Sequence, residues 1–264
     1  MHIYMIMPAH KESGRIRRAI IDYRRTLCAQ HRGSISIIIV TDAEGDTFRI
    51  VSRLARGDSN FSVMSTAHRE GKGGAIIRAL SALCSSRSLR KGDIVIFSDA
   101  DDSVHGNQIE KLIVQLKHSR ADAIIGSRYL SGSKIIGKIT IGRYIASRAY
   151  NMLVRAFFGF DFRDTQCGIK LFSAHAICSI LPRLALVDMS FDVNVLYELK
   201  VAGARIIETP ITFYQRNEGS KVRIARQAPQ MLLATIGFRV SRSRFGAVIP
   251  DSIKGFIYEK VKGW

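Results

Sequence analysis

The sequence has few cysteines, few acidic residues and no long apolar segment. Its four cysteines, Cys28, Cys84, Cys167 and Cys178, form no C-x-x-C pair. This spacing argues against a zinc or dithiol redox site and predicts reduced thiols in a cytosolic protein. The chain runs directly into an expected strand, so we expect no secretory signal. The longest uncharged stretch near the C-terminus, 227–238, is shorter than the ~20 residues that cross a bilayer, so we expect no transmembrane span.

Acidic residues are outnumbered, with 22 Asp and Glu against 40 Lys and Arg, which leaves a net charge of +18. An excess of this size predicts an anionic partner, which is a nucleic acid, a phosphorylated substrate or acidic lipid headgroups. The 47% of hydrophobic and 23% of charged residues exclude disorder, collagen and a coiled coil. A chain of 264 residues is long enough for one large α/β unit.

Short β-branched runs alternate with helical patterns through the first half of the chain. Strands are expected over 3–7, 34–40, 61–65, 93–98 and 121–125, and helices over 15–30 (capped by Ser13), over 75–83 and up to about 118. This alternation predicts an open, mostly parallel α/β sheet with helices on both faces. Ligands of such sheets lie beyond the carboxyl ends of the strands, which indicates the loops 8–14, 41–46, 70–74 and 99–103.

The second half is less regular. We expect helices over 142–158 and 191–201 and strands over 169–172 and 204–213. Residues 1–228 are predicted to form the catalytic domain, and 229–264 a basic amphipathic tail whose one or two helices lie on an anionic membrane surface. Packing on the domain and oligomerisation are the alternatives for the tail.

Three carboxylates, Asp99, Asp101 and Asp102, follow a strongly apolar strand. Crowded carboxylates repel one another unless a cation is present, and a divalent ion that bridges them to a diphosphate would relieve the repulsion. The alternative is a solvated acidic turn that caps the next helix.

Gly71, Lys72, Gly73 and Gly74 open a helix, where backbone amides and a lysine favour an anion. The segment is not a Walker A loop, and a flexible turn is the alternative. Asp42 follows a strand and suits either a nucleobase imide or a helix cap. We interpret Asp192 as a helix cap and His10 as a structural or surface residue.

Taken together, these motifs resemble a known enzyme family. The ordered set is Pro8-Ala9-x-x-Glu12, Asp42, Gly71-Lys72-Gly73-Gly74-Ala75, Asp99-Ala100-Asp101, Gly126-Ser127-Arg128, Asp164-Thr165-Gln166-Cys167-Gly168-Ile169-Lys170 and Gly219-Ser220-Lys221-Val222. It is similar to family 2 glycosyltransferases of the GT-A fold, and within them to polyprenyl-phosphate hexose synthases. The segments 71–75 and 163–168 look more like dolichyl-phosphate glucosyltransferases than mannosyltransferases. The resemblance covers residues 3–222.

The resemblance implies a nucleotide-sugar donor (UDP-glucose favoured, GDP-mannose next) and a polyprenyl or dolichyl phosphate acceptor. The implied donor site comprises Pro8, Ala9, Glu12, Asp42, Gly71, Lys72 and Asp99. The implied ligands of Mg²⁺ or Mn²⁺ are Asp99, Asp101 and Ser103. The implied acceptor-phosphate site comprises Arg128, Arg143, Arg148 and Lys221. The implied catalytic residues are Asp99, Asp101, Arg128 and Asp164.

This pairing accounts for the basic charge, because a phosphate monoester is already largely ionised at neutral pH and needs cations rather than a general base. A peripheral location on the cytoplasmic face of a membrane follows. A soluble or glycan hydroxyl acceptor, with Asp164 or Asp192 as base, remains open. A nucleic-acid-binding module is disfavoured, because Asp99, Asp101 and Asp102 would repel phosphates.

Overall fold

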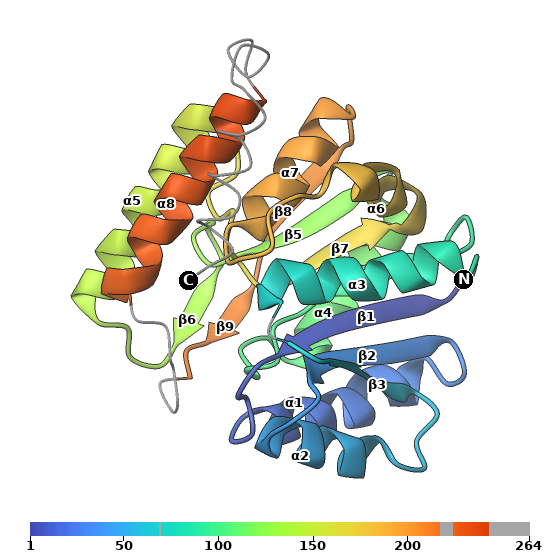
Figure 1. The fold of residues 1–264 in the computed structure, drawn as a ribbon. Coiled ribbons are helices and arrows are strands. Elements are labelled where there is room, and N and C mark those ends of the chain that lie inside the picture. Colours follow the sequence, from blue (N-terminus) through green and yellow to red (C-terminus); the bar gives the residue numbers. More distant parts are fainter. Residues whose placement is uncertain (69, 217–223, 243–264) are drawn as a thin grey trace.

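A seven-stranded sheet forms the centre of the computed structural model, which describes residues 1–68, 70–216 and 224–242 (Figure 1). The strand order is β3-β2-β1-β4-β7-β5-β8. The strands are β1 (Ile3–Ala9), β2 (Ile35–Asp42), β3 (Phe61–Thr66), β4 (Ile94–Phe97), β5 (Ala123–Ser127), β7 (Lys170–Ser173) and β8 (Ile206–Pro210). Only β7 runs antiparallel to its neighbours in this sheet. The prediction of an open, mostly parallel sheet is therefore confirmed.

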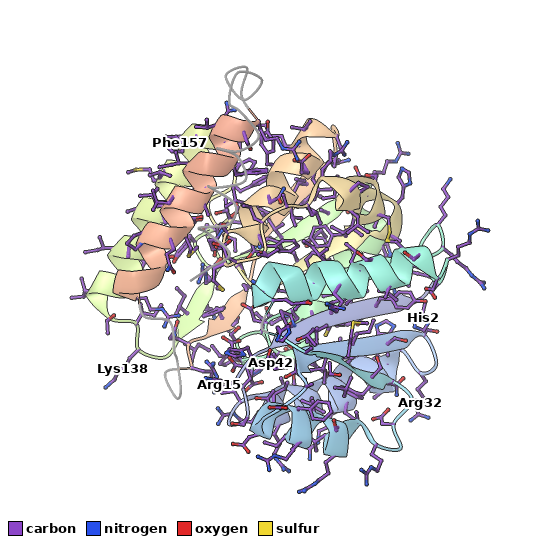
Figure 2. All side chains as sticks on the ribbon, viewed as in Figure 1. His2, Arg15, Arg32, Asp42, Lys138 and Phe157 are labelled. Carbon is purple, nitrogen blue, oxygen red and sulfur yellow. A yellow bond between two sulfur atoms is a disulfide. The ribbon has the colours of Figure 1, made fainter. Side chains whose placement is uncertain are left out.

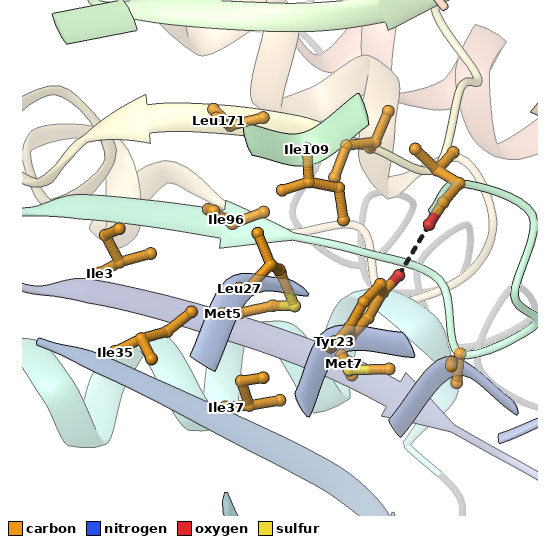
Figure 3. Close-up of a cluster of buried hydrophobic side chains, with 14 of the residues drawn as sticks. Ile3, Met5, Met7, Tyr23, Leu27, Ile35, Ile37, Ile96, Ile109 and Leu171 are labelled. Carbon is orange, nitrogen blue, oxygen red and sulfur yellow. Dashed lines mark hydrogen bonds between the residues drawn. The ribbon is translucent and has the colours of Figure 1, made fainter. Parts of the chain in front are cut away.

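Side chains of alternate strand residues fill the two faces of the sheet. Ile3, Met5 and Met7 of β1 pack with α1 (Ile16–Tyr23), η1 (Arg24–Cys28), α2 (Asp46–Ala55) and α4 (Gly106–His118). Figure 3 shows Tyr23 in this cluster, where its hydroxyl donates to the Val104 carbonyl oxygen at 3.1 Å. Ile6 faces the other side, where α3 (Gly71–Ser85) and α7 (Phe191–Val201) lie. Because strands covered on both faces contain continuous apolar runs, the core strands were readable from sequence.

Several boundaries differ from the prediction. The helix expected over 15–30 consists of α1 followed by the π-helical η1, and its N-cap residue is Arg15 with no side-chain cap bond, so the assignment of Ser13 as cap is wrong. The strand expected over 204–213 is divided between β8 and β9 (Thr212–Tyr214). β9 pairs with β6 (Lys134–Ile136), a strand too short to leave a pattern in the sequence.

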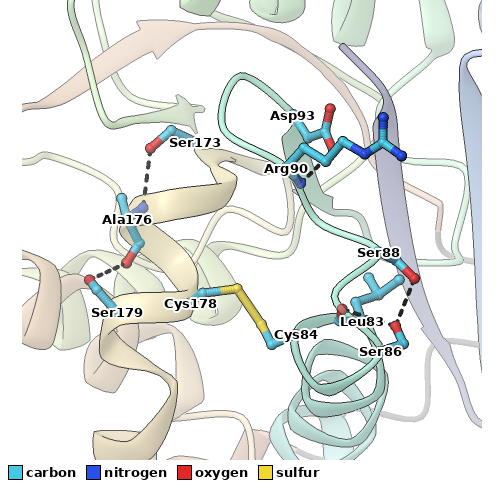
Figure 4. Close-up of a disulfide and its surroundings, with 10 residues drawn as sticks. All are labelled: Leu83, Cys84, Ser86, Ser88, Arg90, Asp93, Ser173, Ala176, Cys178 and Ser179. Carbon is cyan, nitrogen blue, oxygen red and sulfur yellow. Dashed lines mark hydrogen bonds between the residues drawn. A yellow bond between two sulfur atoms is a disulfide. The ribbon is translucent and has the colours of Figure 1, made fainter.

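The expectation of four reduced thiols is wrong for one pair. Cys84 of α3 and Cys178 of α6 (Ala174–Ile180) form a disulfide, whereas Cys28 and Cys167 are free and buried (Figure 4). The two joined cysteines are 94 residues apart. No local spacing marks such a pair, because α3 and α6 meet only through packing on the same face of the sheet.

Helix α5 (Ile141–Phe158) and helix α8 (Ile224–Ser241) lie side by side at one end of the molecule (Figure 1). The Tyr150 hydroxyl of α5 is 2.8 Å from the Thr235 hydroxyl of α8. The domain boundary expected after residue 228 falls inside α8, and residues 243–264 of the expected tail lie outside the described residues. Within the described ranges, no helix is both long and apolar enough to cross a membrane.

Candidate active site

The four loops expected to carry the site follow β1, β2, β3 and β4, which are neighbours in the sheet. Because β1 is parallel to both β2 and β4, their carboxyl ends meet at one edge. Figure 2 labels Arg15 and Asp42 near this edge. Pro8 and Ala9 are the last residues of β1, and Ala9 is buried. The topology therefore gathers segments that are far apart in the sequence.

Asp99 and Asp101 follow β4, and the charge of Asp99 acts on Asp101. Burial raises the pKa of Asp101, and the nearby charge of Asp99 raises it further. The Ser103 amide donates to Asp101 Oδ1 at 3.1 Å. Two carboxylates are hard oxygen donors that suit Mg²⁺ or Mn²⁺, and a cation would relieve their repulsion. No group of three His, Cys, Asp or Glu side chains converges among the described residues, so a diphosphate and water would have to complete a metal site here.

Lys72 lies between two carboxylates. Its Nζ is 3.0 Å from Asp99 Oδ1 and 3.0 Å from Asp192 Oδ2. Asp192 is bonded in turn to Lys170 Nζ at 2.7 Å. Burial of Lys72 opposes its charge, but the two carboxylates prevail and raise its pKa. Burial of Asp192 would raise its pKa, yet Lys170 and Lys72 together hold it below the ordinary value. Asp192 is therefore a buried ion-pair residue, and its interpretation as a helix cap is wrong.

The glycines around Lys72 serve packing as well. The amides of Gly73 and Gly74 donate to the Val187 carbonyl oxygen at 2.9 Å and 3.3 Å. A Cβ atom on Gly73 would lie 2.6 Å from the Leu186 carbonyl oxygen, a distance that no real side chain tolerates. Two of the amides expected to face an anion are thus already bonded within the protein. Similarly, a Cβ atom on Gly168 would lie 2.0 Å from the Asp99 carboxylate.

Asp164 holds Arg128 through a bidentate ion pair. Arg128 Nε is 2.7 Å from Asp164 Oδ2, and its Nη2 is 2.8 Å from Asp164 Oδ1. The Arg128 amide also donates to Asp164 at 3.0 Å. Asp164 has no exposed surface. Burial would raise its pKa, but the Arg128 guanidinium holds it below the ordinary value. The sequence predicted both residues in the site without their pairing.

Three of the four arginine and lysine candidates for the acceptor phosphate come together. The guanidinium carbons of Arg148 and Arg128 lie 4.5 Å and 5.2 Å from the centre of the Tyr129 ring. Burial lowers the pKa of Arg143, the charge of Arg128 lowers it further, and Asp101 acts in the opposite direction. Arg143 is therefore within electrostatic reach of both Arg128 and Asp101. Lys221, the fourth candidate, lies outside the described residues.

Sequence reasoning missed two contacts at this edge. Arg15 was assigned only to a helix, yet its side chain is 2.6 Å from Glu12, and its charge lowers the pKa of Asp101. Burial raises the pKa of Glu12 despite Arg15. His10 Nδ1 is hydrogen-bonded to Asp42, the residue expected to contact a base. The spacing of Glu12 and Arg15 at i, i+3 was the signal available for the first contact. No sequence signal links His10 to Asp42.

Comparisons with known proteins place the chain in a family. Residues 4–186 match the family model Glycosyl transferase family 2. The chain is 28% identical over 228 residues to glycosyltransferase AglD of Haloferax volcanii, which covers 86% of this chain but 35% of that protein. It is 27% identical to the dolichyl-phosphate beta-glucosyltransferase of Saccharomyces cerevisiae, over 86% of this chain and 71% of the relative. It is 28% identical to the undecaprenyl-phosphate mannosyltransferase of Micrococcus luteus, over 69% and 73%.

Solved structures share the fold. Glucosyl-3-phosphoglycerate synthase from Mycobacterium tuberculosis, crystallised with Mn²⁺, UDP and phosphoglyceric acid, superimposes with a TM-score of 0.63 at 17% identity, over 90% of this chain and 78% of that one. Mannosyl-3-phosphoglycerate synthase from Rubrobacter xylanophilus gives a TM-score of 0.62 at 12% identity, over 96% and 80%. The chain has the GT-A type of α/β fold and belongs to glycosyl transferase family 2, so it is a transferase.

Proposed function

We propose that the protein transfers a hexose from a nucleotide-sugar to a polyprenyl or dolichyl monophosphate with inversion at the sugar carbon. UDP-glucose is the favoured donor and GDP-mannose the next. Two relatives support the acceptor class, because their names specify a polyprenyl-type phosphate. They are the yeast dolichyl-phosphate beta-glucosyltransferase and the Micrococcus undecaprenyl-phosphate mannosyltransferase. The Haloferax relative is much longer than this chain, so the activity of a whole relative is itself part of the proposal. We place the enzyme peripherally, on the cytoplasmic face of the membrane that carries its acceptor.

On the donor side, Asp99 and Asp101 would hold Mg²⁺ or Mn²⁺. When bound, the metal ion would neutralise charge on the leaving diphosphate. Lys72 keeps the Asp99 carboxylate in place through its 3.0 Å contact. Arg15 adds a positive charge beside Asp101. The proposed donor site is completed by residues at the ends of neighbouring elements, namely Pro8 and Ala9 at the end of β1, Glu12 in the loop after it, Asp42 at the end of β2 and Gly71 at the start of α3.

On the acceptor side, Arg128, Arg143 and Arg148 would bind the phosphate. Arginine offers a planar fork that matches two phosphate oxygens. Asp164 fixes the orientation of Arg128 before the acceptor arrives, so less side-chain entropy is lost on binding. The attacking phosphate oxygen is already ionised at neutral pH, and no proton has to be removed during transfer.

The single observation that supports a phosphate acceptor is the arginine group, in which Arg128 and Arg148 lie over the Tyr129 ring and Arg143 is within electrostatic reach of Asp101. A hydroxyl acceptor would need a general base, for which the sequence offers Asp164 and Asp192. Both are buried in ion pairs, and cationic partners hold both pKa values below the ordinary range. A carboxylate with a lowered pKa is a weak base, which favours the phosphate acceptor.

An acceptor comparison tests this proposal. Purified enzyme is incubated with a panel of nucleotide-sugars, divalent metal and either polyprenyl phosphate or the corresponding polyprenol, and transfer into the organic phase is measured. We expect product from the phosphate and none from the alcohol. Transfer to polyprenol, or to a soluble sugar only, would contradict it.

Substitution within the acidic motif tests the donor side. Asp101→Asn removes a charge from the proposed metal site, so we expect transfer to fall by about a hundredfold and the half-saturating Mg²⁺ or Mn²⁺ concentration to rise. Asp102→Asn is the matched control. Asp102 is bonded to Arg216 at 2.8 Å, and Asn tolerates its φ of 61°. Equal losses of activity in the two variants would rule out the proposed metal site. Full activity of the wild-type enzyme in the presence of a chelator would rule it out as well.

A further inference from the structure

The side of α5 that faces away from the core is apolar along its whole length. Its exposed residues include Ile141, Ile145, Ala149, Met152 and Ala156. They recur every three or four positions and therefore form one stripe along the helix. Ile141 is 78% exposed and Met152 is 70% exposed. A helix that faces water normally places charged residues at such positions, as α4 does with Lys111 and Lys117.

Helix α8 repeats this pattern beside α5. Its described exposed positions are Pro229, Leu233, Ile236 and Val240, again at spacings of three or four. Leu233 is 65% exposed. On the opposite side, Ala234 and Phe238 are buried, and Phe238 packs with Val154 and Phe158 of α5 in one cluster. We refer to the two exposed stripes together as the apolar face.

The charges on the two helices of the apolar face have a single sign. Neither 141–158 nor 224–241 contains an Asp or a Glu, whereas α5 contributes Arg143, Arg148 and Arg155. Arg148 follows Ile145 by three positions and Arg155 follows Met152 by three, so both residues lie next to the stripe on the helix. The Arg148 guanidinium lies over the Tyr129 ring, and Arg155 donates to the Phe160 carbonyl oxygen. An apolar stripe bordered by arginines is the pattern of a helix that lies in the headgroup region of an anionic membrane.

We propose that the apolar face of α5 and α8 docks on the surface of a phospholipid bilayer that contains anionic lipid. This proposal rests on the proposed function, because a lipid-phosphate acceptor gives the enzyme a reason to dock on a membrane. A lipid phosphate stays at the bilayer surface because its hydrocarbon chain stays in the bilayer. Arg143 and Arg148 belong to the same helix as the apolar stripe. Docking of α5 therefore brings the proposed acceptor-phosphate site to the depth of the lipid headgroups.

A vesicle-binding experiment tests the docking. The full chain is mixed with phosphatidylcholine vesicles that contain or lack phosphatidylglycerol, and the bound fraction is measured by flotation. We expect binding that increases with phosphatidylglycerol and falls by about tenfold or more in Ile145→Glu/Leu233→Glu. The matched control is Val114→Glu/Val201→Glu, which changes two exposed valines of α4 and α7. Equal binding by the two variants would overturn the proposal.

A second readout does not depend on introducing charge. Met152→Cys and Val114→Cys are each labelled with an environment-sensitive fluorophore, with Cys28 and Cys167 buried and thus protected. We expect a blue shift on addition of anionic vesicles for the Met152 label only.

Two other occupants of the apolar face would give different results. If the Ile145→Glu/Leu233→Glu substitutions instead change the sedimentation of a dimer without vesicles, a second copy of the chain covers the face. If the Met152 label is shielded without vesicles while the protein is monomeric, another segment of the chain covers it. Either outcome overturns the proposal.

The acceptor assay separates this proposal from the proposed function. Neither Ile145 nor Leu233 belongs to the proposed acceptor site, so transfer to polyprenyl phosphate in detergent solution should be unchanged in the Glu variant. Stripe-dependent vesicle binding by an enzyme that fails to glycosylate polyprenyl phosphate would sustain the docking surface and refute the acceptor. Transfer in detergent without stripe-dependent vesicle binding would support the acceptor and refute the docking surface.

Discussion

At the scale of residues, the site depends on carboxylates whose partners decide their behaviour. Asp99, Asp164 and Asp192 each have a cationic partner, namely Lys72, Arg128 and the pair Lys72 and Lys170. Asp101 instead adjoins Asp99, and its pKa is raised. The proposed metal-binding role of Asp101 therefore follows from its acidic neighbour, and the proposed arginine-positioning role of Asp164 follows from its cationic partner.

The Arg128–Asp164 pair predicts a specific kinetic effect. Arg128→Lys keeps the charge but loses the bidentate geometry, so we expect kcat/KM for the acceptor to fall by about tenfold to a hundredfold, mainly through KM. The measurement is steady-state transfer with acceptor and donor varied in turn. The control is Arg49→Lys, because the Arg49 side chain on α2 is 75% exposed. An effect confined to the donor KM would contradict the assignment of Arg128 to the acceptor.

The lowered pKa of Asp192 predicts how stability depends on pH. Because its folded-state pKa lies below the unfolded value of about 3.9, the ion pair stabilises the fold at neutral pH, and this stabilisation is lost as pH falls through the folded-state pKa. We expect Asp192→Asn to lower the free energy of unfolding by about 3 kcal/mol at neutral pH, since it leaves Lys72 and Lys170 without their shared partner.

The difference between Asp192→Asn and the wild type should shrink as pH falls below about 4, because protonation of Asp192 removes the same charge. Urea unfolding at several pH values measures it. Asp161→Asn, at an exposed position, should be indistinguishable from the wild type throughout. A constant difference across that range would contradict the ion-pair explanation.

At the scale of elements, α3 joins the site to the core. Its first turn contains Lys72 and the glycines, and the segment around Val187 lies directly against it. The sequence predicted that Gly71 to Gly74 open a helix that continues over 75–83, and α3 does begin at Gly71. Glycines in this first turn permit the close approach of the backbone around Val187.

Two helical glycines allow this packing to be measured. Gly73→Ala places a Cβ atom 2.6 Å from the Leu186 carbonyl oxygen, so we expect the free energy of unfolding to fall by about 2 kcal/mol. Gly142→Ala in α5 meets nothing within 4 Å and should raise it by about 0.5–1 kcal/mol through helix propensity. Urea unfolding of both variants measures these changes. Similar effects of the same sign would refute the close contact.

At the scale of the whole molecule, the Cys84–Cys178 disulfide ties together two segments 94 residues apart. Cross-linking a long loop limits the unfolded chain, so we expect reduction to lower the free energy of unfolding by about 4 kcal/mol. Denaturation with and without dithiothreitol measures the effect, and Cys84→Ser/Cys178→Ser should be insensitive to the reductant. Modification of four thiols in the unreduced, unfolded wild type would show that the bond does not form.

Much of the fold was predictable because it is local. Buried parallel strands such as β2 and β4 are continuous apolar runs, and α7 begins and ends where its pattern does. The short pairing of β6 with β9 could not be predicted, because three-residue strands contain too few residues to show an alternating pattern. Motifs supplied the candidate site residues, and their assignment to donor, metal and acceptor stays a prediction.

By itself, the sequence determined the strand and helix order, the positive charge, and the family that its ordered motifs resemble. Only the tertiary structure decided which charges meet. Lys72 and Asp192 are 120 residues apart, and Arg128 and Asp164 are 36 apart, so no spacing rule connects them. Ion pairs and disulfides form between side chains that are close in space, and that closeness arises from the packing of whole elements on the sheet.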